Sequence, residues 1–202
     1  KQIAVIGVLA ADKANTLDWW AGDGRAEDSV TILEGIRQKV GNGTTLRFEA
    51  GCELIFDSDK DFAAAVDAAR VSDFTIVVVG ETRDISGEAA SRSNIDLPGK
   101  QLDLVKAIHA TGKPYAVVLK NGRPLTINWM AANSPAILET WHSGTMGGAA
   151  VADVLFGDAN LGGKLSLTFP RSVGPIPTHS NSKSNGRTPE TAHRRSRGTT
   201  YE

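Results

Sequence analysis

Residues 74–80 read FTIVVVG, an apolar run rich in β-branched side chains. The run shows no alternation between apolar and polar residues, which is typical of a parallel strand covered on both faces. We therefore predict a central strand at Phe74–Gly80, with helices on each side of the sheet to which it belongs.

Short apolar runs alternate with amphipathic stretches on both sides of this segment, a pattern typical of α/β domains. Further strands are expected at Gln2–Gly7, Leu46–Ala50, Pro114–Leu119, Ala136–Thr140 and Leu165–Phe169. Helices are expected at Ser29–Lys39, Lys60–Ala69, Gly99–Ala110 and Gly144–Phe156. We predict an α/β fold with a six-stranded, mostly parallel sheet sandwiched between helices, in a flavodoxin-like three-layer arrangement over residues 1–175.

The composition changes near the end of the chain. Large apolar residues almost vanish after Ile176, and such a stretch cannot bury enough surface to offset its ordering entropy. We predict that residues 176–202 form a polar tail or linker. The basic cluster at residues 193–197 could instead be a nucleic-acid patch, but the nearly neutral chain favours a solvated tail.

Bulk composition narrows the classes of partner. The chain has 22 basic and 23 acidic residues, a net charge of −1, which argues against a nucleic-acid partner. No apolar run approaches the ~20 residues that span a bilayer, so no membrane contact is expected. A single cysteine, Cys52, excludes an internal disulfide.

The segment after the central strand, residues 80–101, reads GETRDISGEAASRSNIDLPGKQ and is rich in charge. Ligands of open α/β sheets bind outside the carboxyl ends of the strands, so this segment is a candidate site. Glu88 is flanked by small residues, and a substrate-covered carboxyl there would have the raised pKa of a general acid. Alternatively, Glu88 is a surface glutamate that pairs with Arg83 or Arg92.

Other kinds of site have weaker support. The first strand ends in VIGVLAADKAN, which has a single glycine and no GxGxxG, and no GxxxxGK[ST] occurs, which disfavours nucleotide binding. The histidines are dispersed, so neither a metal site nor a cofactor is predicted. WHSGTMGG at residues 141–148 lacks the GxSxG pattern, and Ser143 is expected instead to cap the following helix.

Several longer blocks occur in a characteristic order: IAVIGVLAAD, SVTILEGI, GETRDISGEAASRSNIDLPGKQLDLVKAI, VVLKNGRPLTINW and ILETWHSGTMGGAAVADVLFGDANLGGKLSLTFPRSVGPIP. In order and spacing they resemble the C-terminal α/β-sandwich domain of glycoside hydrolase family 3, of the bacterial β-glucosidase type. The resemblance covers roughly the first 189 residues.

This resemblance implies roles for particular residues. Glu88 matches the family's acid/base glutamate, and an aspartate on a TIM-like barrel would be the nucleophile of retaining hydrolysis of terminal β-D-glucosyl residues. Trp20 matches a tryptophan beside the aglycone, although core packing is the alternative. Arg92 is expected to brace the loop, and Gly122 to Pro124 to shape a turn.

The chain itself shows nothing like the barrel, so it is expected to be inactive alone. Its expected partners are a family 3 barrel domain, in the same or a separate chain, and a β-glucoside or oligosaccharide. The resemblance implies a periplasmic or secreted location, and no signal peptide is visible in the sequence. Two alternatives remain: a non-catalytic carbohydrate-binding or scaffold module of this fold, and a nucleotide-binding α/β domain.

Overall fold

The computed structural model describes residues 1–55 and 57–174, so the predicted tail at 176–202 lies outside the described residues. The strands are β1 (Gln2–Ile6), β2 (Thr45–Glu49), β3 (Phe74–Gly80), β4 (Tyr115–Lys120) and β5 (Ile137–Glu139). The α-helices are α1 (Ala14–Leu17), α2 (Ile32–Val40), α3 (Phe62–Val71), α4 (Gln101–His109), α5 (Asn128–Asn133) and α6 (Gly147–Phe156). Short 3₁₀ helices are η1 (Val8–Ala10), η2 (Ala26–Asp28), η3 (Gly41–Gly43) and η4 (Arg83–Ile85).

In the described part of the chain, the strands form one five-stranded sheet in the order β2-β1-β3-β4-β5. Every neighbouring pair is parallel. This is the strand order of flavodoxin-like sheets. The predicted central strand has the expected bounds and lies in the middle of the sheet.

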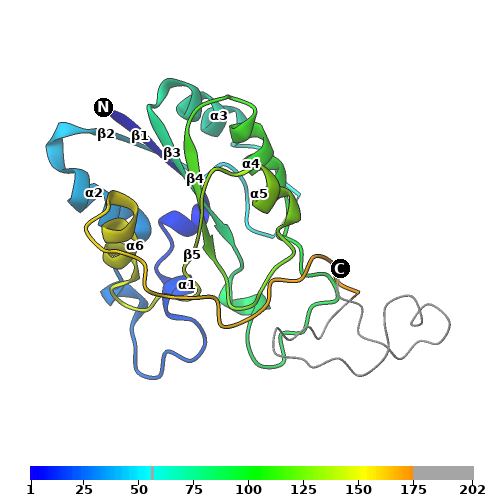
Figure 1. Ribbon diagram of the computed structural model, residues 1–202. Coiled ribbons are helices and arrows are strands. Elements are labelled where there is room, and N and C mark those ends of the chain that lie inside the picture. Colours follow the sequence, from blue (N-terminus) through cyan, green and yellow to red (C-terminus); the bar gives the residue numbers. More distant parts are fainter. Residues whose placement is uncertain (56, 175–202) are drawn as a thin grey trace.

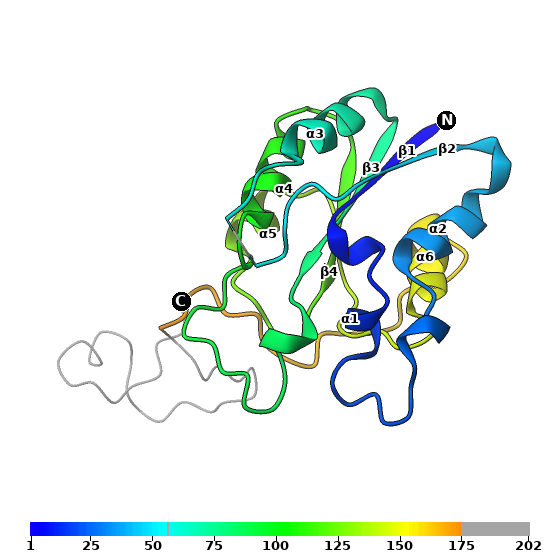
Figure 2. The same ribbon diagram turned by 180° about the vertical axis from the view of Figure 1, so that it is seen from behind.

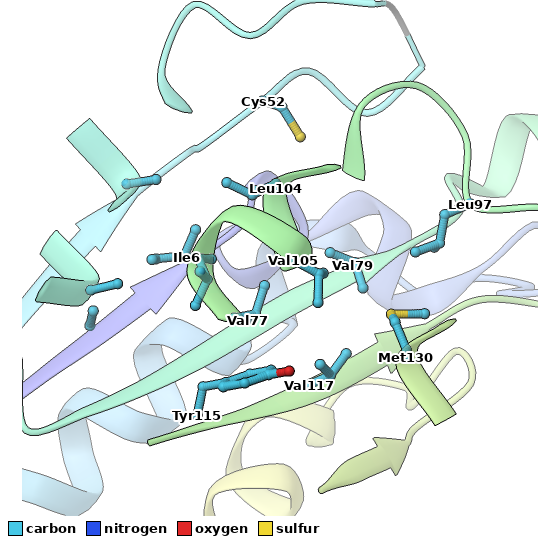
Figure 3. Close-up of a cluster of buried hydrophobic side chains, with 14 of the residues drawn as sticks. Ile6, Cys52, Val77, Val79, Leu97, Leu104, Val105, Tyr115, Val117 and Met130 are labelled. Carbon is cyan, nitrogen blue, oxygen red and sulfur yellow. The ribbon is translucent and has the colours of Figure 1, made fainter. Parts of the chain in front are cut away.

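Helices cover both faces of the sheet (Figures 1 and 2). Successive side chains of a strand point to opposite faces, so Val77 and Val79 join one core while Ile76 and Val78 join the other. The first core is completed by α3, α4 and α5, and Figure 3 shows its side chains gathered over β3 and β4. The second core is completed by η1, α2 and α6.

Two glycines allow α2 and α6 to pack closely. A Cβ atom on Gly35 would lie 2.1 Å from the carbonyl oxygen of Gly148, and one on Gly148 would lie 2.0 Å from that of Thr31. Larger residues at these positions would push the helices apart. Thr31 also begins α2 with a reciprocal capping box with Glu34, which stabilises the first turn.

Three expectations are wrong. Within the described residues, Leu165–Phe169 forms no strand, so the sheet has five strands and is wholly rather than mostly parallel. Leu165 and Leu167 are exposed, which shows that their alternation with polar residues does not mark a buried face. The last helix begins at Gly147 after Met146, so Ser143 is not its N-cap residue.

None of the helices in the described ranges is long and apolar enough to cross a membrane.

Candidate active site

Connections that follow β1, β3 and β4 meet at the carboxyl end of the sheet, the lower end in Figures 1 and 2. The β1 connection contains η1 and α1, and the β3 connection contains η4 and Glu88. The β4 connection begins at Asn121. Side chains of the β1 and β4 connections form hydrogen bonds to the backbone of the β3 connection.

Glu81 follows β3 directly and is fully buried. Its Oε1 accepts a hydrogen bond of 2.5 Å from Nη1 of Arg92 and lies 3.3 Å from Nε of Arg123. Arg92 also donates from Nη2 to the carbonyl oxygen of Asp96, at 3.0 Å. The buried carboxylate of Glu81 thus lies between two guanidinium groups. Through Arg92 it links the start of the β3 connection to the segment at Asp96.

Arg123 holds the same connection by its backbone. Its Nη2 donates to the carbonyl oxygens of Ile85, at 2.5 Å, and Ala90, at 2.7 Å. These carbonyls lie on either side of Glu88 in the chain. One side chain thus bonds to the backbone on both flanks of that residue.

The β1 connection bonds to the β3 connection through Asn15. Its side-chain oxygen accepts from the backbone N–H of Arg83 at 2.7 Å, and its Nδ2 donates to Asp12 Oδ2 at 2.7 Å. The guanidinium of Arg83 lies over the ring of Trp19, 5.4 Å from the ring centre. Trp19 also faces Gly87, where an added Cβ would lie 3.3 Å from Cδ1 of the indole.

Lys120, at the end of β4, bonds to the β1 connection. Its buried Nζ donates to Thr16 Oγ1 at 2.7 Å, to the carbonyl oxygen of Asp12 at 3.0 Å and to that of Leu9 at 3.3 Å. Desolvation lowers the pKa of Lys120 to about 8. Its bonds make Lys120 a support for the backbone of this connection.

Glu139 ends β5 and lines a cavity of about 430 Å³ with Trp141, Leu165 and Phe169 among its walls. Desolvation raises the pKa of this carboxyl to about 7, although it accepts a 2.8 Å hydrogen bond from the backbone N–H of Trp141. Glu139 can therefore exchange a proton near neutral pH.

A family model described as "Glycosyl hydrolase family 3 C-terminal domain" matches residues 1–202. The chain belongs to this family. The resemblance inferred from the sequence blocks is thereby confirmed.

Named relatives of this family 3 domain include both glucosidases and xylosidases. It is 45% identical over 181 residues to a "Beta-xylosidase" of Formosa agariphila, covering 88% of this chain and 25% of the relative. It is 42% identical over 205 residues to a "Periplasmic beta-glucosidase" of Salmonella typhimurium, covering 92% of this chain and 27% of the relative. The chain thus spans about a quarter of the length of these relatives.

Solved structures with the same fold include the β-glucosidase from Listeria innocua in complex with isofagomine. It superimposes with a TM-score of 0.84 and 35% identity, covering 96% of this chain and 27% of the other. The same Listeria enzyme was also solved with glucose, with a TM-score of 0.81, 35% identity, and coverage of 94% of this chain and 26% of the other.

In this family 3 domain Glu88 is exposed, between Gly87 and Ala89. The backbone N–H of Ala90 donates to the carbonyl oxygen of Gly87 at 3.2 Å, so Glu88 is the second residue of a tight turn. Ala89, the third, has a φ of 60°, as turns of type II require. The alternative pairing of Glu88 with an arginine is wrong: among the described residues no ion pair includes Glu88, since Arg92 pairs with Glu81 and Arg83 lies over Trp19.

The tryptophans of the β1 connection lie on the surface. Trp20 is 70% exposed, so its alternative interpretation as a core residue is wrong, and Trp19 is 56% exposed. No role was predicted from the sequence for Trp19 or Glu81, and Arg123 was expected only to help shape a turn. Glu81 carried a usable signal, because a carboxylate directly after a buried strand requires a partner.

No group of three or more His, Cys, Asp or Glu side chains that could hold a metal ion occurs within residues 1–55 and 57–174.

Proposed function

We propose that this chain supplies Glu88 as the acid/base of a retaining β-glucosidase that hydrolyses terminal β-D-glucosyl residues. The nucleophile would be an aspartate of a TIM-like barrel domain, in the same or a separate chain. The observation that carries the proposal is an exposed carboxylate on a turn whose flanking carbonyls are both bonded to Arg123. A general acid needs this combination of access to substrate and a fixed backbone.

The chemistry would take two steps. In the first, the barrel aspartate attacks the anomeric carbon, the glycosidic bond breaks, and Glu88 gives its proton to the departing oxygen. In the second, the ionised Glu88 takes a proton from a water that attacks the glycosyl–aspartate ester. The sugar leaves with its original configuration, and Glu88 is protonated again. The two carboxyls would have to lie ~5–5.5 Å apart.

Two other residues would assist. Trp20 offers an exposed indole at the same end of the sheet, and such a face stacks on the C–H face of a sugar at the aglycone side. Arg92 would brace the loop through Glu81, leaving substrate contact to Glu88 and Trp20.

Glucose is favoured over xylose because the solved Listeria β-glucosidase was obtained with glucose, although one relative is named a xylosidase. The name of the Salmonella relative favours a periplasmic or secreted location. The substrate would be a β-glucoside or oligosaccharide.

The test is hydrolysis of aryl β-glucosides and β-xylosides by this chain alone, and by the chain combined with a family 3 barrel domain. The combination is expected to act on the glucoside, and the chain alone on neither substrate. Glu88→Gln should slow deglycosylation of the combination by about 10²–10⁴-fold. Asp84→Asn is the matched control, because Asp84 is an exposed carboxylate of the same connection and should change little.

Full activity in Glu88→Gln would remove the acid/base assignment. Sugar binding without hydrolysis, in a combination whose two parts demonstrably associate, would favour a non-catalytic carbohydrate-binding or scaffold module. Stabilisation by nucleotides and not by sugars would favour the nucleotide-binding alternative.

A further inference from the structure

Trp19 lies beside two residues that precede Glu88 in the chain. The Arg83 guanidinium lies over its ring, 5.4 Å from the centre, and a Cβ added to Gly87 would lie 3.3 Å from Cδ1 of the indole. Gly87 has a φ of 122°, a conformation that other residues rarely adopt. The indole thus lies beside the residue at the start of the tight turn that carries Glu88.

Trp19 is itself held from the interior of the domain. Asp18 has a φ of 67°, and its Oδ1 accepts a 2.6 Å hydrogen bond from the backbone N–H of Trp19. The same oxygen lies 3.8 Å from Nε2 of His142, whose Nδ1 lies 3.0 Å from the carbonyl oxygen of Asn15. The backbone at Trp19 is therefore linked through Asp18 and His142 to Asn15, which bonds to the β3 connection.

Glu88 has no hydrogen-bond partner for its carboxyl among the described residues. Its position consequently depends on the backbone of its turn. Arg123 bonds to carbonyls on both flanks of the turn, and Trp19 lies beside Gly87 and under the Arg83 guanidinium on the N-terminal flank. The two side chains come from different connections and restrain the same few residues.

We propose that Trp19 is a positioning residue for Glu88. Trp19 holds the turn at residues 87–90 in the place from which the Glu88 carboxyl can reach the leaving oxygen. The inference rests on the proposed function of Glu88. The neighbouring Trp20 has a different role, since it is more exposed and makes neither of these contacts.

Amide hydrogen exchange of this chain tests the structural part without any catalysis. The reporter is the N–H of Ala90, which bonds across Glu88 to Gly87. Trp19→Ala should speed exchange of Ala90 about two- to fivefold, the factor expected for losing a cation–π contact near the surface. The matched control, Trp20→Ala, should leave this exchange unchanged. Equal exchange in the two variants would overturn the proposal.

Kinetics of the active protein, this chain with its barrel domain, test the functional part. Substrates are β-glucosides with different leaving groups, because alkyl and phenyl groups need protonation while 2,4-dinitrophenyl needs little. Trp19→Ala should lower kcat/KM, which reports the first chemical step, about 10- to 100-fold for the poor leaving groups, as a displacement near 1 Å does. The kcat/KM of the 2,4-dinitrophenyl glucoside should fall far less, and Trp19→Phe, which keeps an aromatic ring, should recover most of the loss.

The outcomes separate the two proposals. Leaving-group dependence in Glu88→Gln but not in Trp19→Ala would overturn the positioning role and leave Glu88 as the acid. An equal loss on all substrates with a raised KM in Trp19→Ala would make Trp19 a sugar platform instead. Absence of leaving-group dependence in Glu88→Gln would overturn both proposals together.

Discussion

The Nε of Arg123 lies 3.3 Å from Oε1 of the buried Glu81, while the other end of the same guanidinium bonds to the backbone around Glu88. A charged group inside the domain is thereby connected to an exposed loop. Planar, forked geometry is what allows one side chain to make these contacts at once.

Arg123→Lys should weaken the fold, because an ammonium group cannot reach a carboxylate and two separated carbonyls together. We expect the free energy of unfolding in urea to fall by about 1.5–3 kcal/mol, the range for hydrogen bonds to charged groups. Arg37→Lys, at an exposed position of α2, is the control and should stay within about 0.5 kcal/mol of the parent. Equal stability of the two variants would show that the Arg123 contacts contribute nothing.

Glu139 should make stability depend on pH. Its folded-state pKa of about 7 lies above the ordinary value of 4.5, so between these values the folded protein binds more protons than the unfolded chain. The free energy of unfolding should therefore fall as pH rises from about 4.5 to 7. Glu139→Gln keeps an acceptor for the N–H of Trp141 and should remove this component. Urea titrations at several pH values check it, and parallel curves for parent and variant would contradict it.

Gly148→Ala should separate α2 from α6. The added Cβ would lie 2.0 Å from the carbonyl oxygen of Thr31, a backbone atom that cannot move alone. Although alanine favours helices, we expect a net loss of about 1–3 kcal/mol of unfolding free energy from overpacking. Gly162→Ala is the control, because no atom of residues 1–55 or 57–174 lies within 4 Å of the added Cβ. A stabilised Gly148→Ala protein would show that the two helices can shift without cost.

The central part of the fold was predictable because its signal is local. The apolar run at Phe74–Gly80 predicted both ends of β3 correctly. A strand covered on both faces needs apolar side chains on both, so the run itself carries the signal. Leu165–Phe169 failed for the opposite reason. Its alternation of apolar and polar residues is typical of a strand. A strand also needs a neighbouring strand to pair with, and the sequence of the segment does not say whether one lies beside it.

The site divides in the same way. Glu88 is proposed as a site residue through the family resemblance, because loop composition alone left a surface ion pair open. Arg83 contacts Asn15 and Trp19 and so joins the β3 connection to the β1 connection. Asn15 and Arg83 lie 68 residues apart in the sequence. Only the fold brings these connections together, so no local pattern could have predicted that Trp19 lies beside Gly87.

Chemical rescue of Glu88→Ala by azide tests the central claim most directly. In this variant with its barrel domain, an activated aryl β-glucoside should still form the glycosyl–aspartate ester, while its hydrolysis lacks a general base. Azide needs no base, so it should restore turnover and yield β-glucosyl azide. Asp84→Ala should gain nothing from azide. Rescue with a β-configured product is the predicted result, and fast turnover of Glu88→Ala without azide would contradict the assignment of Glu88 as the acid/base.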